Sequence, residues 1–207
     1  MPADNNNRFD IDGLSILCIL LFLTSCVLVT INLLPSAAAL VKNVSPEVNA
    51  LVDKGASLDR LGNYTGAIAY YDKALAIDPK NVLVLGNKGL ALGSLGNYTE
   101  AIAYINKALA VDPKDVNALN GKGLALDALG NNTGAIQYLD KVLAIDPKNV
   151  FALTFKGHAL DNLGNYTGAI AYFDKALAID PKNVNALTFK GVALSKLRNY
   201  TNNTILR

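Results

Sequence analysis

The 207-residue chain contains 19 Lys or Arg and 17 Asp or Glu residues, which gives a formal net charge of +2 at neutral pH. After residue 40 there are 18 basic residues (19 less Arg8) and 14 acidic ones (17 less three aspartates), a net charge of +4 with the two signs interspersed. Surfaces that bind nucleic acid gather cations on one face with few carboxylates among them, so this pattern argues against DNA or RNA as a partner.

An uncharged apolar segment begins at Leu14 and ends at Leu34. As a helix it would be about 31 Å long, which is enough to cross the hydrocarbon core of a bilayer. Ala37-x-Ala39 follows it closely and is also typical of a signal-peptidase site. Residues 1–39 are therefore predicted to be either a retained signal anchor or a cleaved signal peptide, and residues 40–47 a linker.

Two features favour the retained anchor. The apolar stretch is longer than the hydrophobic region of a usual signal peptide, and the residues before it carry Arg8 against Asp4, Asp10 and Asp12. Residues 23–26 resemble a lipoprotein cleavage box that would place a lipid on Cys26, but the apolar run continues beyond this cysteine, which argues against that modification.

A five-residue segment recurs along the rest of the chain every 34 residues. It reads Leu-Gly-Asn-Tyr-Thr from Leu61 and returns, with small changes, from Leu95, Leu129, Leu163 and Leu197. Two ladders keep the same phase, one of glycines and one of prolines (Gly55, Gly89, Gly123, Gly157 and Gly191; Pro79, Pro113, Pro147 and Pro181). Such self-similarity is typical of a solenoid. The sequence predicts units at residues 48–81, 82–115, 116–149 and 150–183, and a partial fifth unit at 184–207.

Each unit is predicted to contain two helices. In the first unit, apolar or small residues lie on one face of the first helix (Leu51, Gly55, Leu58 and Leu61), and a second stripe follows at helical spacing (Tyr64, Ala67, Ile68, Tyr71, Ala74 and Leu75). Gly62-Asn63 suits the turn between them, and Asp78-Pro79 ends the second helix. The fifth unit is expected to stop inside its second helix.

This frame of small residues, leucine, alanine and proline resembles the tetratricopeptide repeat family over residues 48–207. The resemblance implies an all-α fold: a right-handed α-solenoid of helix-turn-helix repeats, four full units plus a partial fifth, here preceded by one hydrophobic helix. The chain departs from the usual pattern because lysine stands just before each ladder glycine, where leucine is common (Lys54, Lys88, Lys122, Lys156 and Lys190).

The resemblance also implies a curved array whose inner groove is lined by the second, fifth, sixth and ninth positions of each first helix. The candidate ligand-binding residues at these positions are Asn87, Asn120, Phe151, Phe155, His158 and Phe189. Aromatic side chains anchor bound peptides well, although the same rings could instead pack between adjacent helices. Some family members use a basic clamp for a partner's terminal carboxylate, and only Asn87 matches it here.

Each repeat carries Asn-x-Thr at one position, which would be a glycan acceptor in an exported protein (Asn63, Asn97, Asn131, Asn165 and Asn199). The alternative is that asparagine serves the turn and threonine caps the second helix. Glycine near the start of some second helices costs helix propensity, so another constraint is expected to shape this face.

Catalysis is not expected, because His158 is the only histidine and the only cysteines lie in the apolar segment at Cys18 and Cys26. No metal or other cofactor is predicted. The favoured function is a non-catalytic scaffold, membrane-anchored or secreted, that presents its groove outside the cytoplasm to a protein or peptide. The alternative is a glycosylated filament or surface-layer component assembled end to end from copies of the chain, since the last helix keeps the repeat leucines at Leu187 and Leu194.

Overall fold

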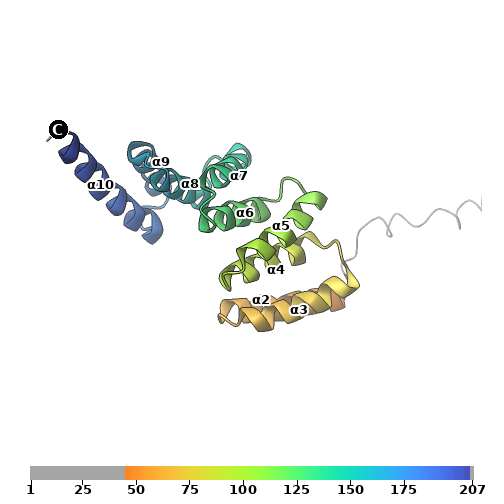
Figure 1. Cartoon of the computed structure of the whole chain (residues 1–207). Helices are drawn as coiled ribbons and strands as arrows, with labels where there is room; N and C mark the ends of the chain where they lie inside the picture. The colour runs from red at the N-terminus through yellow and green to blue at the C-terminus, as the bar shows by residue number, and fades with distance from the viewer. Residues whose placement is uncertain (1–44, 206–207) are drawn as a thin grey trace, which may run out of the picture. The chain divides into compact units, whose positions relative to one another are not determined.

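The computed structural model describes residues 45–205, and these form nine α-helices (Figure 1). The helices are α2 (Pro46–Arg60), α3 (Tyr64–Ile77), α4 (Val82–Ser94), α5 (Tyr98–Val111), α6 (Val116–Ala128), α7 (Asn132–Ile145), α8 (Val150–Asn162), α9 (Tyr166–Ile179) and α10 (Val184–Ile205). The predicted all-α repeat fold is confirmed. The apolar segment at residues 14–34 lies outside the described residues, and no helix within residues 45–205 has the length and apolar character needed to span a membrane.

The helices stack in chain order as antiparallel hairpins. The first helices α4, α6 and α8 each pack on the second helix of their own unit and on the second helix of the unit before it, whereas α2 packs on α3 and α10 packs on α9 (Figure 1). Successive first helices, α2, α4, α6, α8 and α10, also touch one another, whereas the second helices within residues 45–205 touch only first helices. The first helices are thus closer together along the stack than the second helices. The stack therefore curves, and the layer of first helices lies on its inner side.

The turns within the hairpins follow the predicted chemistry. Gly62, Gly96, Gly130 and Gly164 all have φ between 75° and 81°, a conformation that glycine adopts without strain. The next residue is an asparagine whose Oδ1 accepts a hydrogen bond from the third N–H of the second helix (Asn63, Asn97, Asn131 and Asn165). Of the alternative in which asparagine serves the turn and threonine caps the second helix, the threonine cap is wrong, because asparagine both follows the turn and caps the helix.

Four of the first helices begin directly after a capping side chain. Asn81, Asp115, Asn149 and Asn183 each accept a hydrogen bond from the N–H three residues ahead. These bonds satisfy donors that the helix itself leaves without partners, and they fix where each new unit starts.

The fifth unit differs from the expectation of a second helix. α10 runs without a break from Val184 to Ile205, through the position at which every other unit turns. Arg198 stands there in place of the turn glycine. A side chain makes the left-handed turn conformation unfavourable, so the helix continues. Asn199 consequently lies within α10 and not in a turn, unlike the other four repeated asparagines.

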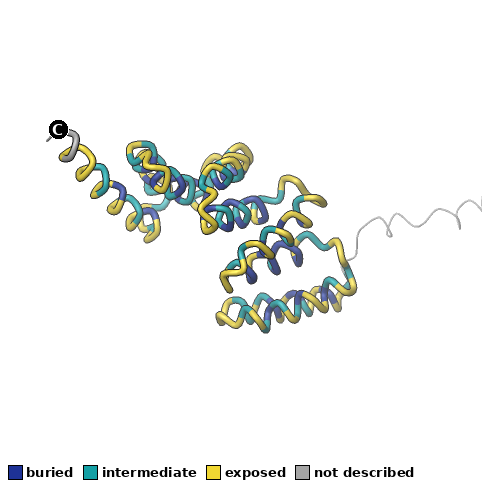
Figure 2. The backbone as a smooth tube through the Cα atoms, viewed as in Figure 1, coloured by how far each residue is buried: buried dark blue, intermediate teal, exposed yellow. Residues whose placement is uncertain are grey.

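The core is a row of similar contacts along the facing sides of the helices (Figure 2). In each complete unit one large side chain of the second helix is fully buried against the ladder glycine of the first helix (Tyr71, Ile105, Leu139 and Phe173). A Cβ atom at Gly157, for example, would lie 2.6 Å from Phe173 Cε1. Complete burial of such a side chain contributes about 1.5–3 kcal/mol, so the ladder glycine is required by packing within the hairpin.

Gly157→Ala is expected to destabilise the array by about 1–3 kcal/mol, because the added methyl group displaces the Phe173 ring. Gly191→Ala provides the matched control, since a Cβ atom at Gly191 meets no heavy atom within 4 Å. This control is expected to be neutral or to stabilise by up to about 1 kcal/mol through helix propensity. Urea unfolding followed by circular dichroism measures both. Equal stabilities for the two variants would contradict this account of the ladder.

Candidate functional site

An aromatic cluster lies on the layer of first helices towards the end of the array. The rings of Phe151 and Phe155 on α8 are 4.3 Å apart between centroids, and Phe155 lies 6.2 Å from Phe189 on α10. The His158 ring is 4.5 Å from Phe189. The structure therefore brings four of the six predicted groove residues together across two units.

The members of this cluster differ in exposure. Phe151 is 37% exposed, whereas Phe155 and Phe189 are half-buried and pack against core residues of the units between which they lie. The packing alternative is therefore observed for Phe155 and Phe189, whereas the ligand-binding role of Phe151 stays a prediction.

A buried carboxylate holds His158. Its Nδ1 lies 2.7 Å from Oδ2 of Asp127 on α6, and the Nδ2 of Asn162 donates to Oδ1 of the same carboxylate at 3.4 Å. The hydrogen bond with Asp127 raises the pKa of His158 above its ordinary value, although burial opposes this shift. The ring is therefore fixed in orientation and favoured in its protonated form, and it lies beside Phe189.

A second buried carboxylate repeats this arrangement one unit later. Asp161 occupies the same repeat position as Asp127, and Lys196 on α10 donates to its Oδ2 at 2.6 Å. Each carboxylate thus pairs with a cation from the following unit. The sequence contained a signal for these carboxylates, since Asp59, Asp127 and Asp161 share one repeat position. Their pairing could not be predicted, because His158 and Lys196 lie more than 30 residues from their partners in the sequence and meet them only through the stacking of units.

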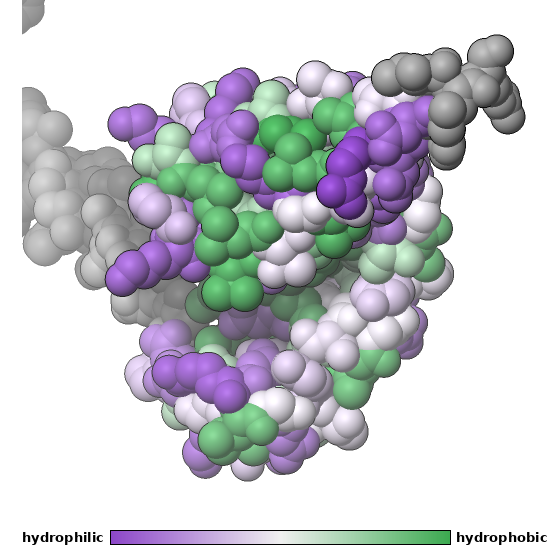
Figure 3. Space-filling model, turned by 90° about the vertical axis from the view of Figure 1, so that its left-hand side faces the viewer, coloured by the Kyte–Doolittle hydropathy of each residue, from purple (hydrophilic) through white to green (hydrophobic). Residues whose placement is uncertain are grey.

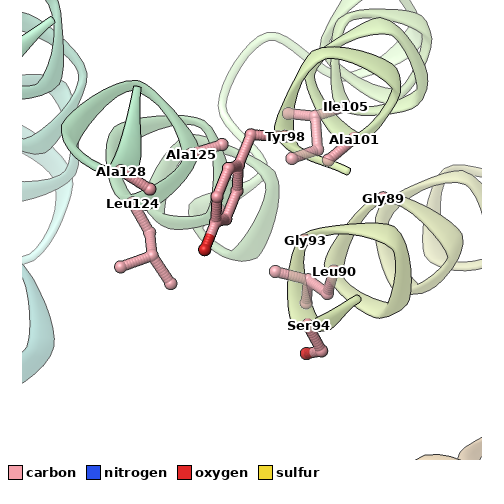
Figure 4. Close-up of a pocket in the computed structure, with 11 residues that line it drawn as sticks. Gly89, Leu90, Gly93, Ser94, Tyr98, Ala101, Ile105, Leu124, Ala125 and Ala128 are labelled. Atoms are coloured by element: carbon pink, nitrogen blue, oxygen red, sulfur yellow. The ribbon is translucent and has the colours of Figure 1, made fainter. Parts of the chain in front are cut away.

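An apolar pocket lies in the same layer between units two and three (Figure 4). Its volume is about 210 Å³, and it is lined mainly by residues of α4, α5 and α6, among them Leu90, Gly93, Tyr98 and Leu124. Gly93 stands where the units with buried carboxylates have aspartate, and a Cβ atom there would meet only a methyl carbon at 3.9 Å. The missing side chain leaves the space that forms the pocket.

The lysines that precede the ladder glycines link successive units. Lys88 makes an ion pair with Asp72 of the preceding unit and lies 3.9 Å from the ring centroid of Tyr104 in its own unit. Burial lowers the pKa of Lys88, but hydrogen bonds to Asp72 and Tyr104 outweigh burial and raise it overall. Equivalent contacts recur at Lys122 and Lys156. The departure from the usual family pattern therefore has a structural role between units.

The remaining predicted groove residues lie apart from the cluster. Asn87 on α4 and Asn120 on α6 are both half-buried, and Asn120 Oδ1 makes no hydrogen bond within the described part of the chain. The asparagines Asn63, Asn97, Asn131 and Asn165 are exposed at the turns, on a different part of each unit from the aromatic cluster.

Comparison with known proteins supports the repeat assignment. Three family models described as tetratricopeptide repeat match residues 46–114, 87–150 and 150–183. Similar solved structures include MamA, with 26% identity over 72% of this chain and 82% of that chain and a TM-score of 0.62. A tetratricopeptide repeat protein from Parabacteroides merdae gives 24% identity, 75% and 62% coverage and a TM-score of 0.61. The first TPR domain of human RPAP3 gives 26% identity, 57% and 93% coverage and a TM-score of 0.56. Comparison with curated proteins finds no significant match.

The pair of His158 and Asp127 predicts a pH-dependent contribution to stability. Because the folded-state pKa of His158 is raised, the pair stabilises the fold fully below the unfolded pKa of about 6.5, and this contribution is lost as the pH rises through the folded pKa. Asp161 strengthens the effect and Lys196 weakens it.

His158→Gln keeps a hydrogen-bond donor near Asp127 but removes the titration. In urea unfolding, the stability advantage of the natural chain over this variant is expected to be larger at about pH 5.5 than at about pH 9. A difference that does not change with pH would show that the histidine charge contributes nothing to the fold.

Proposed function

Because the chain belongs to the tetratricopeptide repeat family, we propose that it is a non-catalytic scaffold that binds a protein or peptide along its layer of first helices. The observation that carries the proposal is the aromatic cluster of Phe151, Phe155, His158 and Phe189. An exposed ring supported by half-buried rings in one cluster is a suitable anchor point for a peptide.

The proposed ligand contacts two places along this layer. A bulky apolar side chain of the ligand enters the pocket beside Leu90 and Leu124, whose volume of about 210 Å³ suits one large side chain. A second apolar or aromatic side chain packs on Phe151. The hydrogen-bonded partners of His158 are the carboxylate of Asp127 and the amide of Asn162, which hold the ring in place.

The location of the array is part of the proposal. The apolar segment at residues 14–34 would hold the repeats at the outer face of a membrane, or would direct their secretion if it is cleaved. The repeated asparagines support an outer location, because Asn63, Asn97, Asn131 and Asn165 are exposed and each begins an Asn-x-Thr sequence. Glycans at these turns would leave the layer of first helices uncovered.

End-to-end assembly of copies is the second candidate function. It is favoured by the apolar face of α10, where Leu187 and Leu194 are exposed although their counterparts in earlier units are buried or half-buried. Contacts of this head-to-tail kind produce open filaments unless they close into a ring.

Selection of peptides from a random displayed library on the full chain tests the groove. Peptides selected on the natural chain are expected to bind Phe151→Ala at least about tenfold more weakly, because about 1.4 kcal/mol of anchor contact is lost. Ile145→Ala is the matched control, since Ile145 is an exposed apolar residue at the end of α7. Equal binding to Phe151→Ala, or equal losses in both variants, would reject the site.

Mass spectrometry of the protein from its native source tests the outer location. Glycans are expected on several of the repeated asparagines, and Thr65→Ala should remove one glycan from Asn63 while the cap and the stability, to within about 0.5 kcal/mol, are kept. Bare Asn63, Asn97 and Asn165 would end this part of the proposal.

A further inference from the structure

One face of α10 has the packing positions of a first helix, but within residues 45–205 no second helix covers them as in the earlier units. In four preceding units, a Cβ atom at the ladder glycine would lie 2.5–2.9 Å from a large side chain of the second helix (Gly55 with Tyr71, Gly89 with Ile105, Gly123 with Leu139 and Gly157 with Phe173). At Gly191 no heavy atom of residues 45–205 lies within 4 Å of the same position. The place that receives a large side chain in each earlier unit is open in α10.

The residues around Gly191 are exposed in the same way. Leu187 is 50% exposed, whereas the equivalent Leu119 and Leu153 are 2% and 4% exposed. Leu194 is also exposed, at 48%. Figure 3 shows the array from the side on which α10 lies, with hydrophobic side chains gathered over the upper part of that face. We call Leu187, Lys190, Gly191 and Leu194 the α10 seat.

Lys190, the charged residue of the α10 seat, has one of the two contacts that the equivalent lysines make. Lys190 pairs with Asp174 of the preceding unit at 2.5 Å, as Lys88 and Lys156 pair with their aspartates. Its side chain is nevertheless 30% exposed, against 6% and 12% for those two lysines. In their units the lysine also lies over a tyrosine of the second helix, which covers it. An occupant with a tyrosine at that place would bury Lys190 in the same manner.

We propose that the α10 seat binds an amphipathic helix of a partner protein and thereby completes the fifth hairpin. The four helices that fill equivalent places in this chain define the chemistry of the occupant. Each has a large apolar residue with alanine four residues before it and alanine or valine three residues after it (Ala67, Tyr71 and Ala74; Ala101, Ile105 and Ala108; Ala135, Leu139 and Val142; Ala169, Phe173 and Ala176). Tyrosine precedes the large residue in all four.

A partner's helix suits the α10 seat better than a second copy of this chain. End-to-end stacking of a copy would bring up α2, a first helix whose own glycine already receives Tyr71. A copy could offer a second helix only by withdrawing it from its own hairpin, which would expose a fully buried side chain such as Phe173. A helix that is not otherwise packed has no such cost.

The probe is a labelled synthetic peptide with the sequence of α7, residues 132–145, added to the full chain purified in detergent. Saturable binding by fluorescence anisotropy is expected. Gly191→Phe should weaken this binding at least about tenfold, because the added ring fills the α10 seat, and it should leave the fold intact because nothing lies within 4 Å of that position. Asn185→Phe is the matched control, since it adds the same ring about 240° around the same helix. A peptide with aspartate in place of Leu139 should not bind.

No saturable binding of the α7 peptide, or equal binding to Gly191→Phe and the natural chain, would overturn the proposal. Self-association of the full chain in sedimentation that Gly191→Phe abolishes would instead assign the α10 seat to a second copy and overturn the choice of partner. Phe151→Ala should leave binding of the α7 peptide unchanged. Failure at the α10 seat is therefore distinguishable from failure of the proposed groove.

Discussion

The structure depends on the contact, in each of the four complete units, between one glycine of the first helix and one large side chain of the second helix. Gly55 receives Tyr71 in the first unit, and Gly157 receives Phe173 in the fourth. The absence of a side chain on one helix lets a bulky one from the other be completely buried, so each hairpin closes on a single interlocking pair. From the second unit on, the lysine next to the ladder glycine connects its unit to the one before, because Lys88, Lys122, Lys156 and Lys190 each reach an acidic or amide side chain of the preceding unit. Two adjacent residues, the ladder glycine and the lysine before it, therefore provide the packing within a unit and the polar contact between units.

The regular part of the fold could be predicted from the sequence because every boundary has its own chemical signal. Gly62 adopts the left-handed turn, Asn63 caps the helix that follows, and both recur at the 34-residue period. The exception was also present in the sequence, since Arg198 replaces the turn glycine. Its consequence, an unbroken α10, was missed because the following Asn-Tyr-Thr residues kept the pattern of a new helix.

The candidate site could be predicted only in part. The spacing of Phe151, Phe155 and His158 placed them on one face of one helix, and the structure keeps them together. Which ring is exposed depends on how closely α10 approaches α8, and residue spacing within a helix does not contain that information. The carboxylate of Asp127 was missed for a similar reason, because it meets His158 across two units. The pocket beside Gly93 likewise arises because glycine replaces aspartate at one repeat position and leaves no side chain there.

The unbroken α10 also bears on how the array loses its structure. In a linear stack each unit is held by its neighbours alone, so opening starts where a unit has contacts on one side. α10 touches α8 and α9 and extends beyond them, and its residues after Arg198 belong to no hairpin. Backbone amides in that extension should exchange with solvent fastest, and protection should rise towards the middle of the stack. Among the described helices α10 is then less stable than the helices in the middle of the stack, and any molecule that covers it would raise the stability of the units behind it.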